Sequence, residues 1–144
     1  MKISKKGCYG LIALVHLASQ GKRELVCLKE ICNRQNISRK YLAHIMNLLT
    51  KAGFVHSIRG SRGGYQLSQS ADKTKLSQII QVLEGSVAPT DCVDNCQICP
   101  RAPDCSLRDV WAMVKVVIEK ALESMSLLDL VYLQKRKAEK TGNK

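Results

Sequence analysis

The sequence contains few aromatic residues. Its 144 residues include one Phe, one Trp and four Tyr, so a hydrophobic core must be built mainly from aliphatic side chains. It also lacks an unbroken apolar run of about 18 residues, which a membrane-spanning helix requires. The apolar stretch near the N-terminus is interrupted by Gly10 and His16 and has no small-residue cleavage pattern, so we do not expect a signal peptide. We therefore predict a cytoplasmic chain without a membrane partner.

The residue patterns of common catalytic sites are also missing. No Ser/His/Asp set, pair of neighbouring carboxylates or phosphate-binding glycine loop stands out along the chain. The three histidines, His16, His44 and His56, are scattered and form no metal-binding motif. We therefore expect neither an enzyme nor a small-molecule substrate.

Acidic residues are almost absent from the first half of the chain. Residues 1–65 contain 12 Lys and Arg but only Glu24 and Glu30, a net charge of +10, whereas residues 66–144 carry +1. A basic surface that merely aids solubility would be spread more evenly. The asymmetry indicates a polyanionic partner for the first half, and nucleic acid is the usual one.

Helical periodicity and capping residues predict a helix-turn-helix in the basic half. Ser38 can cap the third expected helix, and Gly53 follows its end. Two helices joined by a three-residue turn, the second with a basic start, are typical of DNA-binding helix-turn-helix units. The three helices are expected at about 3–19, capped by Ser4, at 28–35, and at 39–52.

The residues that follow predict a β-hairpin. Apolar and polar residues alternate over 54–58 and again from Tyr65 to Leu67, with a Gly- and Arg-rich loop between them. A hairpin with a cationic tip at this position is the wing of a winged helix. One more helix, at 76–84, completes the predicted DNA-binding domain, residues 1–85.

The start of the third helix and the tip of the hairpin supply the candidate DNA contacts. A capped helix start presents backbone N–H groups to a phosphate, and its first turn can meet base edges. Arginines beside glycines suit a narrow minor groove, because glycine permits a close approach of the backbone. The predicted DNA-binding residues are Ser38, Arg39, Lys40, Tyr41 and His44 on the helix, and Arg59, Gly60, Arg62, Gly63 and Gly64 on the hairpin.

Four of the seven cysteines lie in the segment "DCVDNCQICPRAPDC", residues 91–105. An odd number of cysteines in a chain expected to stay in a reducing compartment argues against a disulfide knot. Structural zinc sites usually have two CxxC pairs, and only Cys96 and Cys99 form one here. Closely set thiolates favour an iron–sulfur cluster. Cys105 precedes a predicted helix start, where the helix dipole favours a thiolate.

Residues 106–137 contain neither Gly nor Pro. Ser106 and Asp109 resemble a capping box, and apolar or small residues recur three or four apart from Val110 to Leu128. A single helix of this length would extend about 45 Å, which is more than a small globule can cover. We therefore expect it to form the interface of a homodimer; the alternative is that it folds back over its own core.

The predicted fold class is mainly α with a small β-hairpin wing: a winged helix-turn-helix followed by a long C-terminal dimerisation helix. The predicted division is a DNA-binding domain at 1–85, a cysteine-rich cluster-binding loop at 86–105, the dimerisation helix at 106–137 and a flexible tail at 138–144.

The segment "ISRKYLAHIMNLLTKAGFVHSIRGSRGGYQL" resembles the IscR/NsrR-type (Rrf family) winged-helix iron–sulfur regulators. The order of first helix, helix-turn-helix, "RGSRGGY" wing, cysteine cluster and C-terminal helix is similar over nearly the whole chain. This resemblance implies a dimeric transcription factor, usually a repressor, whose affinity for operator DNA depends on a 2Fe–2S or 4Fe–4S cluster. Ala43 departs from the pattern, because many members carry there an acidic residue that tunes DNA sequence preference.

The resemblance also implies the cluster ligands. The loop would supply three, which are Cys92, Cys99 and Cys105. The fourth ligand varies in the family, and here it is either Cys96 within the loop or Cys8 of the partner subunit; we favour Cys8, which otherwise has no evident role. IscR-like relatives use a His three residues after the last Cys, but Arg108 stands there and cannot ligate. Cys27 and Cys32 are interpreted as buried structural thiols.

Two alternative functions remain open at this point. The same scaffold could sense through bare thiols or zinc without a cluster. An electron carrier or cluster-trafficking protein is a second alternative, but it leaves the wing and the recognition helix unexplained.

Overall fold

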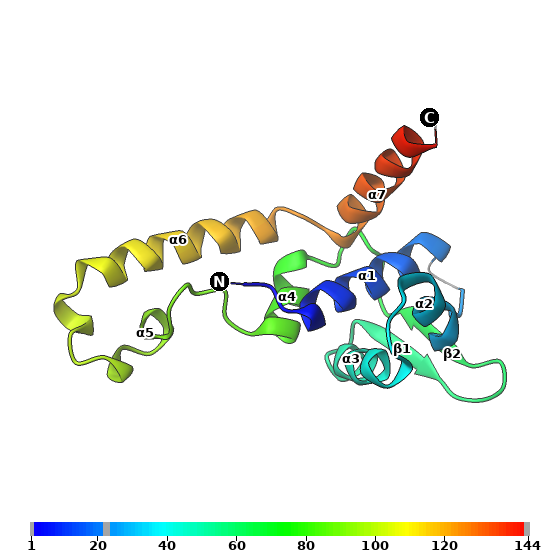
Figure 1. Ribbon diagram of the computed structural model, residues 1–144, viewed down its shortest axis with the longest axis horizontal. Coiled ribbons are helices and arrows are strands. Elements are labelled where there is room, and N and C mark those ends of the chain that lie inside the picture. The colour runs from blue at the N-terminus through cyan, green and yellow to red at the C-terminus, as the bar shows by residue number, and fades with distance from the viewer. Residues whose placement is uncertain (1, 22–23, 143–144) are drawn as a thin grey trace.

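The computed structural model describes residues 2–21 and 24–142. Figure 1 shows a small body from which two helical arms extend. The mainly helical class with a single hairpin is as predicted. The helices are α1 (Lys5–Gln20), α2 (Leu28–Gln35), α3 (Arg39–Lys51), α4 (Leu76–Glu84), α5 (Asp91–Asp94), α6 (Ser106–Glu123) and α7 (Leu127–Thr141), the strands are β1 (Val55–Ile58) and β2 (Gly64–Leu67), and two short 3₁₀ helices are η1 (Cys96–Ile98) and η2 (Ala102–Asp104).

The two predicted N-caps, Ser4 and Ser38, lie at the starts of the first and third helices. The Ser4 hydroxyl accepts from the Gly7 N–H at 3.3 Å at the start of α1. The Ser38 hydroxyl accepts from the Tyr41 N–H at 3.4 Å at the start of α3. Between them, Asn36 follows α2 in the left-handed conformation (φ 51°) and turns the chain toward α3.

The core is aliphatic, as the scarcity of aromatic residues predicted. It lies where α1, α3 and α4 meet. Gly10 lets α1 and α4 approach closely, because a Cβ atom there would lie 2.4 Å from Leu83 Cδ1. Fully buried members include Leu14, Leu42, Ile45, Met46, Leu49, Ile79 and Leu83.

The hairpin is the predicted wing. β1 and β2 pair antiparallel, with Val55 opposite Leu67 and Ile58 opposite Gly64. The segment before α2 adds a bridge: Val26 and Tyr65 exchange backbone hydrogen bonds of 3.0 and 2.9 Å. The wing is thus tied to the start of the helix-turn-helix.

The predicted continuous helix over 106–137 is wrong. The chain leaves α6 after Glu123 and begins α7 at Leu127. The break is stabilised from outside the segment, because the Leu76 N–H donates to the Met125 carbonyl at 3.0 Å and the Leu127 N–H donates to the Thr74 carbonyl at 2.8 Å. These bonds to the start of α4 replace those that a continuous helix would make.

The capping box lies at this break, not at Ser106. The Ser126 N–H donates to Asp129 Oδ2 at 2.7 Å, and the Asp129 N–H donates back to the Ser126 hydroxyl at 3.3 Å. The Ser126 hydroxyl also donates to Asp129 Oδ2 at 2.7 Å, and the two bonds from the Ser126 N–H and hydroxyl to this carboxylate hold the pKa of Asp129 below its usual value. At the predicted position, Cys105 is the N-cap of α6 and no side chain caps the helix.

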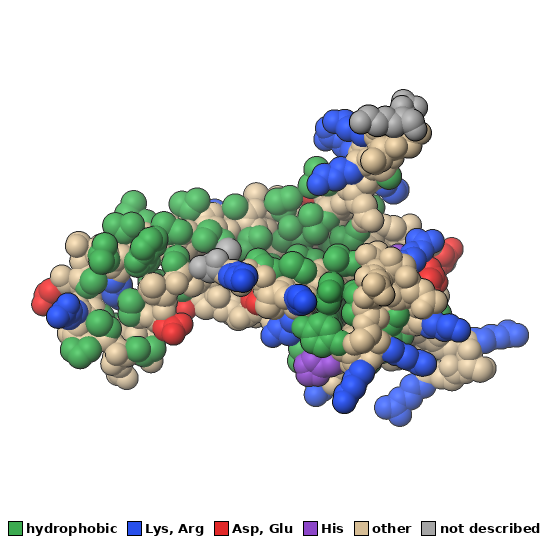
Figure 2. Space-filling model, viewed as in Figure 1, with side chains coloured by type: hydrophobic (Ala, Val, Ile, Leu, Met, Phe, Trp, Pro, Cys, Tyr) green, Lys and Arg blue, Asp and Glu red, His purple; other side chains and the backbone are tan. Residues whose placement is uncertain are grey.

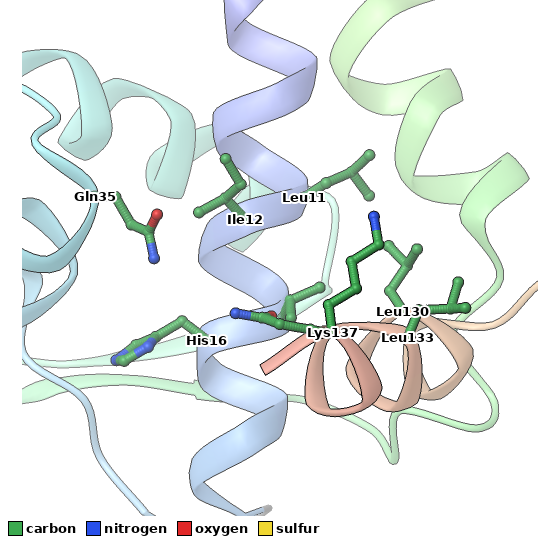
Figure 3. Close-up of a pocket in the computed structure, with 9 residues that line it drawn as sticks. Leu11, Ile12, His16, Gln35, Leu130, Leu133 and Lys137 are labelled. Atoms are coloured by element: carbon green, nitrogen blue, oxygen red, sulfur yellow. The ribbon is translucent and has the colours of Figure 1, made fainter. Parts of the chain in front are cut away.

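The first turns of α7 pack against α1, whereas the rest of α7 and the whole of α6 project away from the body (Figure 1), so the alternative of a helix folded back over its own core applies only to the start of α7. Leu127 and Val131 are buried against the core. Farther along, α7 separates from α1 and leaves an open groove of about 360 Å³ (Figure 3), lined by Leu11, Ile12, Val15, His16, Gln35, Leu130, Leu133, Gln134 and Lys137. Only the first turns of α7 are therefore anchored.

Two further boundaries differ from the predictions. The cysteine segment is not a plain loop, because it contains α5 and both 3₁₀ helices. Residues 138–141, expected in a flexible tail, belong to α7, and residues 143–144 lie outside the described part of the chain. Within the described ranges, no helix combines the length and the apolar character needed to cross a bilayer.

Candidate nucleic-acid interface and cysteine loop

The predicted recognition residues lie on the exposed face of α3. Ser38, Arg39, Lys40, Tyr41 and His44 are all exposed, while the opposite face of α3 is buried in the core. Figure 2 shows Lys and Arg side chains projecting from the end of the molecule that carries α2, α3 and the hairpin. The charge asymmetry of the sequence thus becomes a basic surface at one end of the fold.

Tyr41 also contacts another aromatic ring, which the sequence did not predict. Its ring meets the ring of Tyr9 edge to face, with centroids 6.0 Å apart and an interplanar angle of 80°. This geometry is favourable for aromatic pairs. Since Tyr9 lies on α1, the pair links the first turn of the recognition helix to the helix that carries Cys8.

The glycines of the wing serve the hairpin itself. Gly60 has φ +119°, which favours glycine. A Cβ atom on Gly63 would lie 2.1 Å from the Ile58 carbonyl oxygen, and one on Gly64 would lie 2.7 Å from the Val26 carbonyl oxygen. These glycines therefore set the shape that presents the exposed Arg59 and Arg62 at the tip.

A hollow of about 350 Å³ lies between the wing and the start of α2. Lys29 and Arg39 line it together with the hairpin loop. The sequence analysis did not include Lys29 among the DNA contacts, although a basic residue in the first turn of the second helix was visible.

The interpretation of Cys27 as a buried thiol is wrong. Cys27 is exposed, lines the same hollow and occupies the N-cap position of α2. Cys32 is buried as predicted, and burial raises the pKa of its thiol.

The loop cysteines lie in or next to four successive short elements. Cys92 is in α5, Cys96 begins η1, Cys99 follows η1, and Cys105 is the residue before α6. All four are free thiols; Cys96 is exposed and the other three are half-buried. The Thr90 hydroxyl lies 3.4 Å from Cys92 Sγ. In the described ranges, no three His, Cys, Asp or Glu side chains are gathered closely enough to form a metal site.

The donor set nevertheless fits an iron–sulfur cluster in its chemistry. Cys92 to Cys105 offer four unpaired thiols within fourteen residues, on a segment made of one helical turn and two short 3₁₀ helices. Cys8, the other candidate, is exposed in the first turns of α1 and lies in no group of metal-binding side chains with the loop. The loop would have to contract around a cluster to hold it.

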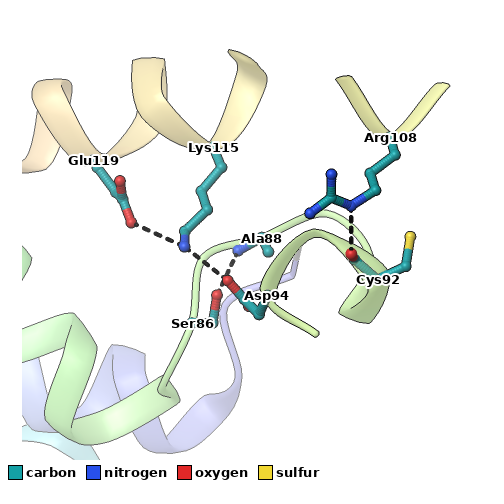
Figure 4. Close-up of polar contacts among 7 residues, drawn as sticks. All are labelled: Ser86, Ala88, Cys92, Asp94, Arg108, Lys115 and Glu119. Carbon is teal, nitrogen blue, oxygen red and sulfur yellow. Dashed lines mark hydrogen bonds and ion pairs between the residues drawn. The ribbon is translucent and has the colours of Figure 1, made fainter. Parts of the chain in front are cut away.

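Two polar contacts fix the loop to α6 (Figure 4). Arg108 Nε donates to the Cys92 carbonyl oxygen at 2.9 Å. Lys115 Nζ donates to Asp94 Oδ1 at 2.7 Å and lies 3.5 Å from Glu119 Oε1. The hydrogen bond from Lys115 lowers the pKa of Asp94, and the same bond raises the pKa of Lys115.

A family model described as "Rrf2: Iron-dependent Transcriptional regulator" matches residues 3–132. The chain belongs to the Rrf2 family. A protein named Rrf2 from Nitratidesulfovibrio vulgaris is 34% identical over 131 residues, which cover 91% of this chain and 87% of that protein. The family assignment makes this chain a DNA-binding transcriptional regulator and not an enzyme.

Solved structures of Rrf2-type regulators have the same fold. The structure of CymR, the global cysteine regulator of Bacillus subtilis, matches with a TM-score of 0.76 and 34% identity, over 92% of this chain and 98% of that one. The structure of T. potens IscR matches with a TM-score of 0.73 and 36% identity, over 92% of this chain and 87% of that one. The winged-helix architecture of this Rrf2 protein is thus shared with both an IscR and a CymR.

Proposed function

We propose that this protein is a homodimeric repressor whose affinity for operator DNA is controlled by an iron–sulfur cluster bound to the cysteine loop. The observation that carries the proposal is the position of the loop. Four free thiols lie at the outer end of α6, the helix that extends from a DNA-binding body and exposes an apolar face.

The DNA-binding part of the proposal is supported by the basic, exposed surface of α3 and the wing. Arg39 and Lys40 lie in the first turn of the recognition helix, and Arg59 and Arg62 lie at the wing tip. In a dimer, two such surfaces would contact two half-sites about one helical turn of DNA apart. Domain 1–85 would then be the reader, and residues 86–105 would be the sensor.

The dimer is supported by the composition and exposure of α6. No residue of this helix is buried, although it has a strong apolar face. Leu107, Met113 and Val117 are 65%, 69% and 66% exposed, and Figure 2 shows hydrophobic side chains gathered along this arm. Contiguous exposed apolar surface of this kind marks an interface, and a second copy of the same helix would cover it.

The cluster would be held by Cys92, Cys99 and Cys105, with a fourth ligand from Cys96 or from Cys8 of the partner subunit. Such a cluster supplies a redox-active and nitric-oxide-reactive iron centre. The protein's part is to bind the cluster better in one arrangement of the dimer than in another. A differential of about 3 kcal/mol is enough to change the affinity for operator DNA about a hundredfold.

Oxygen-free purification followed by iron and sulfide analysis tests this proposal. We expect a coloured protein that contains iron and acid-labile sulfide and migrates as a dimer. Cys105→Ala should lose the cluster while DNA binding by the winged helix remains, and Cys27→Ala, an exposed cysteine away from the loop, should retain it. Iron-free wild-type protein that still responds fully to its signal on DNA would contradict the proposal.

The second candidate is a regulator that senses through bare thiols or zinc. It is favoured by the separation of the four thiols, which are free and partly accessible without being gathered. A colourless protein with stoichiometric zinc, or one whose DNA binding changes on reversible thiol oxidation alone, would select this candidate. An electron carrier is no longer an alternative, because the family is one of transcriptional regulators.

A further inference from the structure

The cysteine loop is attached to α6 through side chains that are not metal ligands. Arg108 reaches the main-chain oxygen of Cys92, and Lys115 reaches the carboxylate of Asp94. Arg108 and Lys115 are seven residues apart, two turns of one helix, so both lie on the same face of α6. Glu119, one turn beyond Lys115 and 3.5 Å from its ammonium, continues this stripe.

This polar stripe lies opposite the exposed apolar face. At 3.6 residues per turn, Val110, Met113 and Val117 point roughly to the other side of the helix from Arg108 and Lys115. Their side chains are 49%, 69% and 66% exposed. One side of α6 thus holds the cysteine loop, and the other side is free to meet a second copy of the chain.

The attached part of the loop has few other contacts, of which the Ser86 side chain beside Asp94 is one (Figure 4). Helix α5, Asp91–Asp94, is a single turn and cannot be stable on its own. None of its residues is fully buried, and only Cys92 and Val93 are half-buried, so hydrophobic packing contributes little to holding it. The side chains of Lys115 and Asp94 are only 26% and 34% exposed, which shields their ion pair from solvent more than a fully exposed pair.

We propose that Arg108 and Lys115 are positioning residues that hold α5 on α6, so that a rearrangement of the loop thiols displaces α6 and not the loop alone. This inference deepens the proposed function and rests on it for the identity of the bound group. The attachment itself consists of contacts within the chain and can be measured on protein prepared without the cluster.

Hydrogen–deuterium exchange of the full-length metal-free protein is the first test. Lys115→Met and Arg108→Met should each raise the exchange rate of residues 91–95 by about two- to fivefold, the effect expected for one partly shielded polar contact. Lys115→Arg should restore slow exchange, and Lys120→Met, on the same helix and exposed, should change nothing. Wild-type exchange at residues 91–95 in both Met variants would overturn the proposal.

The second test measures transmission. In Lys115→Met, the ratio between the DNA affinities of the cluster-loaded and the metal-free protein should move several-fold closer to one. The iron content, the cluster absorbance and the DNA affinity of the metal-free protein should stay at wild-type values. Loss of the cluster in this variant, or an unchanged ratio with the cluster bound, would overturn the positioning role. If the wild-type protein binds no cluster, the proposed function fails, and the exchange experiment alone then decides whether the attachment exists.

Discussion

The wing arginines should account for a measurable share of the salt dependence of DNA binding. Arg59 and Arg62 are exposed on the loop between β1 and β2. Neither forms an ion pair with another described residue, so both guanidiniums are available to phosphates. Substituting both by Ala removes two positive charges from the tip and leaves Gly60, Gly63 and Gly64, which shape the hairpin, in place.

The expected magnitude follows from counterion release. Each neutralised phosphate adds about 0.9 to the slope of log affinity against log salt concentration, so the double variant should lose about 1.8 units of slope. Between about 50 and 200 mM salt, the wild-type protein should therefore lose about 12-fold more affinity than Arg59→Ala/Arg62→Ala. The two proteins should converge in affinity as the salt concentration rises.

Fluorescence anisotropy on a labelled duplex of arbitrary sequence measures this slope, because the phosphate term does not depend on sequence. Arg136→Ala/Lys140→Ala on α7 is the matched control, since it removes the same charge from outside the reader. Equal slopes for the wing variant and the wild-type protein would refute the role of the wing. An equal loss of slope in the control would attribute the effect to net charge alone.

Three predictions concern the framework. Leu127→Ala, at a fully buried position, should lower the free energy of unfolding by about 3 kcal/mol in urea titrations; an unchanged midpoint would mean that α7 is not docked. Gly10→Ala should cost about 1–3 kcal/mol, because its methyl group would meet Leu83, and wild-type stability would disprove the close α1–α4 approach. Asp129→Asn should reduce stability at neutral pH, and the difference should vanish as the pH falls through the lowered pKa of Asp129; a pH-independent difference would exclude the role of its charge.

Local signals predicted most of the reader. The second helix, at 28–35, and the fourth, at 76–84, match the observed boundaries; each is amphipathic and is followed by a residue with positive φ, Asn36 and Gly85 respectively. The Ser4 and Ser38 caps were visible because capping depends on the nearest few residues. The wing followed from alternation around a Gly-rich loop, which local backbone preferences also decide.

The local sequence does not predict the break between α6 and α7, because the segment "ESMSLL", residues 123–128, contains neither Gly nor Pro. Its backbone partners are Thr74 and Leu76, some fifty residues earlier. The one local signal was Ser126-x-x-Asp129, a capping box that resembles the Ser106-x-x-Asp109 pattern chosen instead. Tertiary hydrogen bonding, not propensity, decided between the two positions. The exposure of Cys27 likewise depends on where the wing places the start of α2.

The same break supplies a physical route from the sensor to the reader. The end of α6 and the start of α7 are joined to the start of α4. The backbones of Lys75 and Ser126 form an antiparallel β-bridge, and the Ser77 hydroxyl donates a hydrogen bond to the Glu123 carboxylate. α4 in turn packs on both α1 and α3. In the proposed mechanism, a shift of α6 therefore reaches the recognition helix through packed elements and not through a flexible linker. A continuous helix over 106–137 would lack this junction. The break between α6 and α7, which the sequence pattern did not predict, is therefore the feature on which coupling between the cysteine loop and α3 would depend.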